Sequence, residues 1–308
     1  MAAILLADVG GTNARLALAR DGEVLDDSLT RFAGQDFASF DEVLRSYLDE
    51  QGNPALEALC VAVAGPVAGG RARLTNRDWS FSEDNLARIA GVGRARLIND
   101  LVALGYGVPG LSGAGVADLL ASASPRPDNG QALVVNAGTG FNVCAVHRAQ
   151  DGRITCLESE EGHTRLPDSV SLALRDLLGG AAAPFTSVEE LFAGRGLALL
   201  HRQRTGRPAL RAEEVTSTAS EGDPEADATL RIYAQLLGLH CRELTMRFLP
   251  YSGIYLAGSV ARACVAQIDV FADAYRRDLL MRELVEATPV RMICDDLAAL
   301  QGCLAAVR

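Results

Sequence analysis

Residues Ile4-Leu5-Leu6-Ala7-Asp8-Val9-Gly10-Gly11-Thr12-Asn13 open the chain with an apolar run that ends in a carboxylate and a glycine pair. A second apolar stretch, Ala14 to Arg20, follows directly, so the pattern predicts a β-hairpin that turns at the glycines. Adjacent glycines let backbone N–H groups approach an anion, Thr12 adds a hydroxyl donor, and Asp8 at a strand end is suited to a hydrated cation. This segment alone leaves two interpretations open, a phosphate-binding loop and an ordinary hairpin.

A second copy of the arrangement favours the phosphate-binding interpretation. The stretch from Gln131 to Arg148 again runs strand, glycine loop and strand, with Asn136-Ala137-Gly138-Thr139-Gly140 as the loop. Repetition at this distance predicts two related halves rather than a short-period solenoid. Two such loops facing each other would clamp a polyphosphate.

Composition excludes several kinds of phosphate chemistry. The 29 basic residues are all arginine, because the chain contains no lysine. A Walker lysine, the strand lysine of protein kinases and a Schiff base each need an amine, so these mechanisms are excluded. Backbone amides, hydroxyls, Mg²⁺ and arginine are then left to bind nucleotide phosphates.

Charge and hydropathy narrow the partners and the location. The formal net charge of −10 argues against nucleic acid or an anionic membrane as the main partner, because both normally require a basic face. We find neither an apolar span of about 18 residues nor a basic segment before the first strand, and therefore expect a cytoplasmic protein.

Strands and helices alternate along the chain, which indicates an α/β protein of 308 residues with two domains. We place the first domain at residues 1–109 and a larger α/β domain at 110–295, with 110–130 as a connecting segment before the second hairpin. A C-terminal helix, about 296–308, is expected to pack back on the first domain. The strand Ile254 to Ala257 runs into Gly258, a third junction suited to touching a nucleotide.

Six blocks of sequence, in order along the chain, resemble bacterial ATP-dependent glucokinases of the actin, Hsp70 and hexokinase superfamily. The resemblance implies an α/β, two-domain actin-like ATPase (ribonuclease H-like) fold with an active-site cleft between the domains. It also implies an ATP-dependent hexose kinase, most simply a glucokinase, that phosphorylates the 6-hydroxyl of glucose and forms a homodimer. The zinc-binding cysteine cluster of the related repressor and sugar-kinase family is absent. The blocks are Asp8-Val9-Gly10-Gly11-Thr12-Asn13-Ala14-Arg15, Leu74-Thr75-Asn76-Arg77-Asp78-Trp79-Ser80-Phe81-Ser82, Ile98-Asn99-Asp100, Ala137-Gly138-Thr139-Gly140, Glu160-Glu161-Gly162-His163 and Ala257-Gly258.

Sugar phosphorylation requires a base for the hydroxyl proton, and the resemblance assigns that role to Asp100. On the residues alone, an aspartate that caps the following helix is an equal alternative. Glu189 and its neighbour Glu190 both remain candidates for one sugar-binding carboxylate. The residues expected to bind the sugar are Asn76, Asn99, Asp100, Glu160, His163 and Glu189.

ATP and Mg²⁺ are the expected cofactors, with the metal near Asp8 through water. ADP and polyphosphate stay open as phosphoryl donors, because either would suit glycine loops. The residues expected to bind the nucleotide are Asp8, Gly10, Gly11, Thr12, Asn13, Gly138, Thr139 and Gly258.

Several positions depart from the glucokinase pattern. Glu161 stands at the first glycine of a Glu-Gly-Gly-His motif, Phe141-Asn142 replaces an aliphatic-glycine pair, and Ser259 replaces a second glycine. If position 161 needs a positive φ, glutamate there costs about 1 to 3 kcal/mol. These departures keep two alternatives open, a paralogue acting on another hexose and a non-catalytic sugar or nucleotide sensor. An actin-like or chaperone-like ATPase fits the short chain less well.

Overall fold

The chain divides into two units in the computed structural model, which describes residues 2–74, 77–124, 126–207, 211–277 and 281–308. The first unit is Met1–Gly115 with Asp295–Arg308, and the second is Val116–Cys294. The division falls a few residues beyond the boundary predicted at residue 109. No helix in the described segments has the length and apolar character needed to cross a bilayer.

The first unit contains a six-stranded sheet in the order β3-β2-β1-β5-β9, with β4 paired to β2, and a separate three-stranded sheet β6-β7-β8. Strands β1 and β2 form the predicted hairpin, while β5 and β9 run parallel to β1. The elements are β1 (Ala3–Val9), β2 (Asn13–Arg20), β3 (Glu23–Val24), β4 (Thr30–Ala33), α1 (Phe40–Glu50), β5 (Leu56–Val63), β6 (Val67–Ala68), β7 (Arg71–Arg73), β8 (Ser80–Ser82), α2 (Glu83–Ala90), β9 (Ala95–Asn99), α3 (Asp100–Gly107) and α12 (Ala298–Val307).

The second unit contains a six-stranded sheet in the order β10-β15-β14-β11-β12-β13. Its helices pack around α8, the longest helix, which contacts α10, α7, α6 and α4. The elements are β10 (Val116–Leu120), β11 (Gln131–Ala137), β12 (Phe141–Arg148), β13 (Ile154–Leu157), α4 (Asp168–Leu178), α5 (Val188–Phe192), α6 (Gly194–Thr205), α7 (Ala212–Ser220), α8 (Pro224–Phe248), β14 (Gly253–Ala257), α9 (Ser259–Ala263), α10 (Ile268–Tyr275), α11 (Arg282–Ala287) and β15 (Val290–Ile293).

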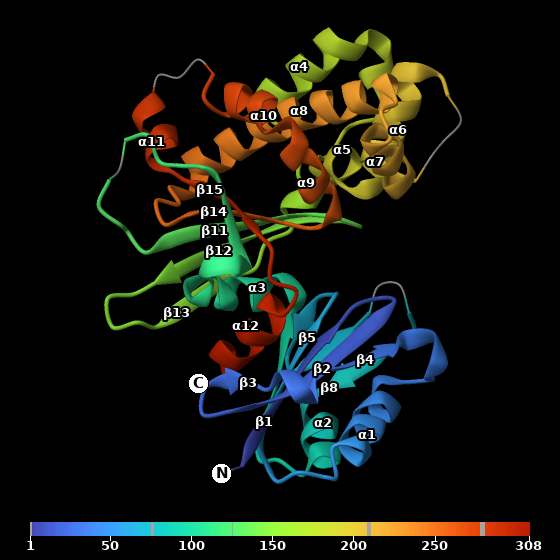
Figure 1. Ribbon diagram of the computed structural model, residues 1–308, viewed down its shortest axis with the longest axis vertical. Coiled ribbons are helices and arrows are strands. Elements are labelled where there is room, and N and C mark those ends of the chain that lie inside the picture. The colour runs from blue at the N-terminus through green and yellow to red at the C-terminus, as the bar shows by residue number, and fades with distance from the viewer. Residues whose placement is uncertain (1, 75–76, 125, 208–210, 278–280) are drawn as a thin grey trace. The chain divides into compact units, whose positions relative to one another are not determined.

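Both sheets share one arrangement of five strands. In each, a hairpin is followed by two parallel strands, so β3-β2-β1-β5-β9 corresponds to β13-β12-β11-β14-β15. Figure 1 shows the two sheets, with the hairpin strands β1 and β2 labelled in the first and β11 and β12 in the second. The internal repeat predicted from the two glycine loops is therefore present in the fold.

The C-terminal helix α12 belongs to the first unit and packs on α3, β5 and β1, as the red ribbon beside α3 shows in Figure 1. Glycine makes the helix pair possible, because a Cβ on Gly302 would lie 1.7 Å from the carbonyl oxygen of Ala103. A Cβ on Gly107 would lie 2.6 Å from the carbonyl oxygen of Ala298. Backbones this close exclude any larger residue at either glycine.

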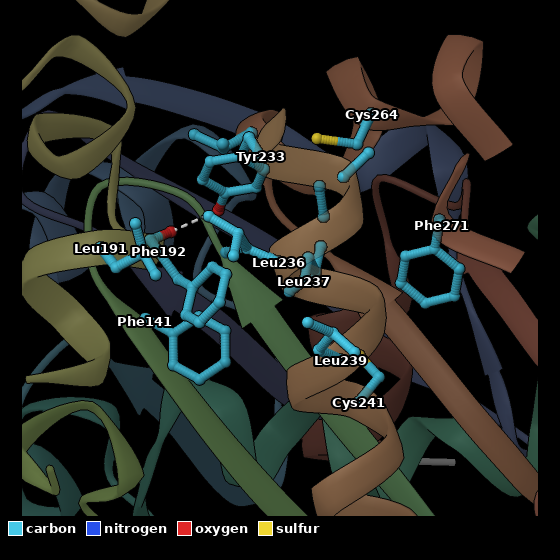
Figure 2. Packing of buried hydrophobic residues seen from close by; sticks show 14 of the residues in the cluster. Phe141, Leu191, Phe192, Tyr233, Leu236, Leu237, Leu239, Cys241, Cys264 and Phe271 are labelled. Atoms are coloured by element: carbon cyan, nitrogen blue, oxygen red, sulfur yellow. Dashed lines mark hydrogen bonds between the residues drawn. The ribbon is translucent and has the colours of Figure 1, made fainter. Parts of the chain in front are cut away.

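The main hydrophobic core of the second unit lies between its sheet and α8. Figure 2 shows Phe141 from β12, Phe192 from α5 and Tyr233 from α8 in this core. The Tyr233 hydroxyl donates a hydrogen bond of 2.6 Å to the carbonyl oxygen of Phe192, so the one polar group of the ring is satisfied.

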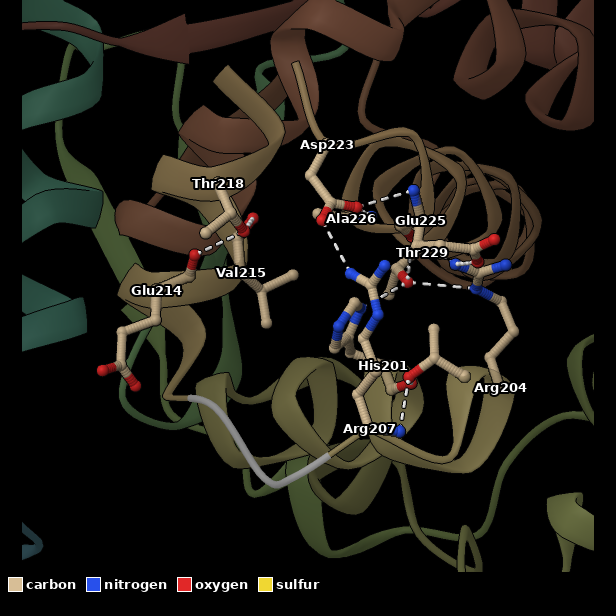
Figure 3. A network of polar contacts seen from close by, with 11 residues as sticks. His201, Arg204, Arg207, Glu214, Val215, Thr218, Asp223, Glu225, Ala226 and Thr229 are labelled. Atoms are coloured by element: carbon tan, nitrogen blue, oxygen red, sulfur yellow. Dashed lines mark hydrogen bonds and ion pairs between the residues drawn. The ribbon is translucent and has the colours of Figure 1, made fainter. Parts of the chain in front are cut away.

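A polar network fastens α6 to the start of α8 (Figure 3). The Thr229 hydroxyl lies 2.9 Å from Nδ1 of the buried His201 and accepts a hydrogen bond of 3.1 Å from Nε of Arg204. Arg204 also pairs with Glu225 at 2.5 Å. Nδ1 of His201, the Thr229 hydroxyl and Arg204 thus have partners in this corner, whereas Nε2 of His201 is buried and has none among the described residues.

One part of the predicted connecting segment is wrong. Residues 110–130 include β10, which pairs antiparallel with β15 at the edge of the second sheet. Its five residues are all partly exposed or exposed, so the apolar signal of a buried strand is missing.

Candidate functional site

The first glycine hairpin forms a tight turn between β1 and β2. The amide of Gly10 donates to the carbonyl oxygen of Asn13 at 2.9 Å, and the amide of Gly34 donates to the carbonyl oxygen of Thr12 at 2.8 Å. Within the described part of the chain, the amides of Gly11 and Thr12 have no hydrogen-bond acceptor. Two adjacent free N–H groups are what an anion-binding turn offers.

Asp8 lies on β1 just before this turn. Burial raises the pKa of its carboxyl group, and the positive charge of Arg15 offsets part of that effect. Its oxygens accept no hydrogen bond from any described residue. A carboxylate in this state suits Mg²⁺, which normally takes one or two protein carboxylates and completes its shell with water and phosphate oxygens. The described ranges contain no group of three or more His, Cys, Asp or Glu side chains that could hold a metal ion.

Asn99 and Asp100 occupy the junction of β9 and α3. The Asn99 side chain caps α3, because its Oδ1 accepts from the amide of Leu101 at 3.0 Å, and its Nδ2 donates to the carbonyl oxygen of Gly65 at 3.1 Å. Asp100 is the first residue of the helix and not its cap. The residue that caps α3 is therefore Asn99, and the capping alternative considered for Asp100 is wrong.

The Asp100 carboxyl group has an unusual environment. Burial, followed by the nearby negative charge of Asp8, raises its pKa to about 6. One oxygen accepts from the amide of Leu101 at 2.8 Å, which opposes the rise. A carboxylate with a pKa near neutrality is suited to accept a proton.

Asn76 lies outside the described residues, but its neighbour Arg77 is described. The Arg77 guanidinium donates to the carbonyl oxygen of Gly34 at 2.7 Å and to that of Gly11 at 3.4 Å, and it lies over the Trp79 ring at 5.1 Å. Sequence reasoning missed this arginine at the glycine hairpin. Its place directly after Thr75-Asn76, in a chain without lysine, was the available signal.

The second glycine loop lies between β11 and β12. Gly138 donates to the carbonyl oxygen of Gly140 at 2.9 Å, and the amides of Thr139 and Gly140 have no acceptor among the residues described. Gly258 approaches this loop with φ of +93°, and a Cβ there would lie 2.3 Å from the carbonyl oxygen of Ala137. Only glycine fits that position. The predicted phosphate loop and the predicted adenosine junction are therefore neighbours.

Glu160 and His163 flank a short 3-10 turn, Glu161–His163, and both are exposed. The amide of His163 donates to the carbonyl oxygen of Glu160 at 3.0 Å. Their side chains are thus held on one turn and open to solvent, as ligands for a polar substrate must be.

Glu189 and Glu190 have different partners on α5. Glu190 completes a capping box, because its Oε2 accepts from the amide of Ser187 at 2.9 Å and from the hydroxyl of Thr186 at 2.6 Å. Hydrogen bonds from Thr186 and Ser187 lower its pKa. Glu189 instead pairs with Arg195 at 2.6 Å.

Glu189 also lies against the second glycine loop and the turn Glu161–His163. Its Oε2 would be 3.4 Å from a Cβ on Gly140 and 3.1 Å from a Cβ on Gly162. Arg195, its ion-pair partner, was missed because it gives no signal in the sequence. The geometry therefore favours Glu189 over Glu190 as the carboxylate near these loops.

Glu161 does not carry the strain considered from the sequence. The non-glycine residues with positive φ in the described segments are Asp21, Asn53 and Leu249, so position 161 has ordinary backbone angles. The Glu161 side chain is 10% exposed and points toward α8 rather than into solvent. The Glu161 charge is thus paired within the second unit, by Arg247 of α8. Ser259 begins α9, and nothing in the structure explains this substitution.

The structure gathers the candidate residues into two sets, one in each unit. Of the sequence-predicted residues, the first unit holds Asp8, Gly10, Gly11, Thr12, Asn13, Asn99 and Asp100, and the second holds Gly138, Thr139, Glu160, His163, Glu189 and Gly258.

Comparison with known proteins finds curated bacterial glucokinases. The chain is 33% identical over 270 residues to a glucokinase of Caulobacter vibrioides, which covers 83% of this chain and 80% of that protein. It is 27% identical over 313 residues to a glucokinase of Marinobacter nauticus, with 98% and 96% covered.

Solved structures show the same architecture. Glucokinase from an Antarctic psychrotroph superposes with a TM-score of 0.84 at 27% identity, covering 99% of this chain and 98% of that one. Glucokinase from Balamuthia mandrillaris in complex with glucose gives 0.74 at 21% identity, covering 98% and 92%. A ROK family glucokinase from Streptomyces griseus in complex with glucose and AMPPNP gives 0.65 at 20% identity, covering 98% and 97%.

The repeated sheets and the superposed glucokinase structures show the actin-like two-domain kinase fold. The family model for glucokinase matches residues 5–308. The chain belongs to the glucokinase family, and its activity is that of an ATP-dependent glucose kinase.

Proposed function

We propose that the protein transfers the γ-phosphoryl group of ATP to the 6-hydroxyl of glucose and that Asp100 is the general base. The observation that carries this assignment is the Asp100 carboxyl group, which does not cap α3 and has a pKa raised to about 6. As the sugar oxygen attacks the phosphorus atom, Asp100 accepts the hydroxyl proton, and ADP leaves.

The sugar ligands of this proposal are the residues predicted from the sequence. They are Asn76, Asn99, Asp100, Glu160, His163 and Glu189. The exposed turn that carries Glu160 and His163 supports the assignment, since acceptors and donors on one turn suit adjacent hydroxyls.

The nucleotide is proposed to contact both glycine loops and Gly258. Free amides at Gly11 and Thr12, and at Thr139 and Gly140, support phosphate binding without lysine. Asn13 follows the first loop. We assign Mg²⁺ to Asp8 through water, and when bound it neutralises charge on the phosphates. The Streptomyces griseus relative, solved with glucose and AMPPNP, supports this pair of substrates.

Membership of the hexokinase, actin and Hsp70 superfamily and assembly as a homodimer are part of the proposal, because the family resemblance implies both. A cytoplasmic location, and the lack of nucleic acid and membrane partners, stay predictions from the charge and hydropathy of the chain.

The substitution Asp100→Asn tests the assignment. The amide keeps the size of the side chain but cannot accept the proton, so we expect kcat to fall by about 10²- to 10⁴-fold. A coupled ADP assay measures kcat, and glucose binding by titration calorimetry serves as the control that the site is intact. Turnover close to that of the unsubstituted protein would exclude Asp100 as the base.

A further inference from the structure

Three positions that depart from the glucokinase pattern lie together in the second unit. Phe141 and Asn142 begin β12, and Glu161 begins the turn that carries His163. They are distant in sequence from α8, yet each contacts either this helix or a residue of the turn Glu161–His163. A single arrangement therefore connects substitutions that look unrelated in the sequence.

Glu161 is tied to α8 by charge. Its Oε1 lies 2.5 Å from Nη1 of Arg247 and 3.8 Å from Nε2 of His240. Burial, and then the charge of Arg247, lowers the pKa of His240 to about 3, so the imidazole is neutral near pH 7. Arg247 is therefore the cation that compensates the buried carboxylate.

Asn142 links the same turn to the sugar carboxylate. Its Oδ1 accepts from the amide of Glu161 at 3.1 Å. Its Nδ2 donates to the carbonyl oxygen of Ser159 at 2.6 Å and to Oε2 of Glu160 at 3.3 Å. A glycine at position 142 would provide neither the acceptor nor the donor.

Phe141 anchors this end of β12 in the core. Its ring centroid lies 5.5 Å from that of Phe192 and 5.4 Å from that of His240. The labelled rings of Phe141 and Phe192 face each other in Figure 2. The start of β12 thus packs against His240 of α8, the helix that also carries Arg247.

We propose that Glu161 and Asn142 are positioning residues for glucose, acting through Glu160 and His163. The inference rests on the proposed sugar-binding role of those two residues. Where the family pattern has two adjacent glycines, this chain has one, and the Glu161–Arg247 ion pair holds the turn on α8. The Asn142 amide then orients the Glu160 carboxylate before glucose arrives, which lowers the entropic cost of binding.

Glucose binding without nucleotide, measured by titration calorimetry, tests the proposal on two variants. Glu161→Gln keeps the shape of the side chain and removes its charge, and Asn142→Ala removes the contact with Glu160. For each we expect about tenfold weaker glucose binding, the effect of losing a hydrogen bond to a charged group. The KM for glucose should rise in parallel, while kcat and the KM for ATP change by less than about twofold.

Two further variants keep the test open if a buried substitution impairs folding. Arg247→Met breaks the ion pair at its more exposed partner. The double variant Glu161→Gln, Arg247→Met should bind glucose no more weakly than Glu161→Gln alone. Arg242→Met is the matched control, because Arg242 lies on the same helix and pairs with Glu243 at 3.1 Å. We expect the control to bind glucose as the unsubstituted protein does.

The outcomes separate this inference from the proposed function. If the unsubstituted protein phosphorylates glucose but the variants bind glucose with unchanged affinity and only melt at lower temperature, the positioning role is wrong and the function stands. If the unsubstituted protein binds glucose without phosphorylating it, the function fails, and tenfold weaker binding by the variants still supports positioning. No glucose binding by the unsubstituted protein overturns both.

Discussion

The first unit contains two candidate carboxyl groups, those of Asp8 and Asp100, that lie near each other. The two carboxyl groups are close enough for the charge of Asp8 to raise the pKa of Asp100, and Asn99 takes the capping role that Asp100 would otherwise fill. This division of labour leaves Asp100 available for proton transfer. Arg15 is the cation that moderates Asp8.

The pKa of Asp100 sets a pH dependence. A base works only when deprotonated, so turnover should be constant above about pH 6 and fall about tenfold per pH unit below it. An ordinary aspartate, with a pKa of 3.8, would keep full activity down to about pH 5. The measurement is kcat/KM for glucose from pH 4.5 to 8 at fixed ionic strength. A profile flat to pH 5 would show that Asp100 is not the titrating base.

Helix α5 separates the roles of two adjacent glutamates. Glu190→Ala removes the capping box and should lower the free energy of unfolding by about 1 kcal/mol, with little change in the KM for glucose. Glu189→Gln should raise the KM for glucose and leave the free energy of unfolding nearly unchanged, because its carboxylate lies by Gly140 and Gly162 and not in the cap. Urea unfolding and steady-state kinetics on both variants measure the two effects. An exchanged pattern would assign the sugar contact to Glu190.

The contact between α3 and α12 depends on glycine. Gly302→Ala places a methyl group 1.7 Å from the carbonyl oxygen of Ala103, so the helices must separate. We expect the free energy of unfolding to fall by roughly 3 kcal/mol, the upper end for overpacking a core. Gly93→Ala is the control, since a Cβ there meets nothing within 4 Å. Equal unfolding midpoints for the two variants would show that α12 does not pack on α3 as described.

The elements near each glycine loop were predictable because their signals are local. An apolar run followed by glycines predicted β1, β11 and β14. The repeated loops even predicted related halves. Strand β10 was missed because its pairing with β15 joins residues more than 150 positions apart, while none of its own residues is buried.

The site was predictable in its composition and less so in its contacts. The choice between Asn99 and Asp100 as the helix cap depends on side-chain direction, which adjacent residues do not reveal. The pair Glu161–Arg247 spans 86 positions, so the sequence alone showed only an unexplained charge at residue 161. The structure supplies the missing partner.

At the scale of the whole molecule, the chain contains the same arrangement of five strands twice. Each copy offers a glycine turn with free amides, and the copies differ in what surrounds the turn: carboxylates at Asp8 and Asp100 in the first unit, and the Glu160–His163 turn in the second. Because the chain has no lysine, the proposed phosphate binding rests on these amides and on arginine. In that proposal, the same fold element supplies both nucleotide contacts.

The most direct test is ADP release from Mg-ATP by the full chain, with and without glucose, followed by a panel of other hexoses. A glucose kinase should form ADP rapidly only when the sugar is present, with one glucose 6-phosphate made per ADP, because the sugar hydroxyl and not water receives the phosphoryl group. Equal ADP release with and without glucose, or none with any hexose, would contradict the account.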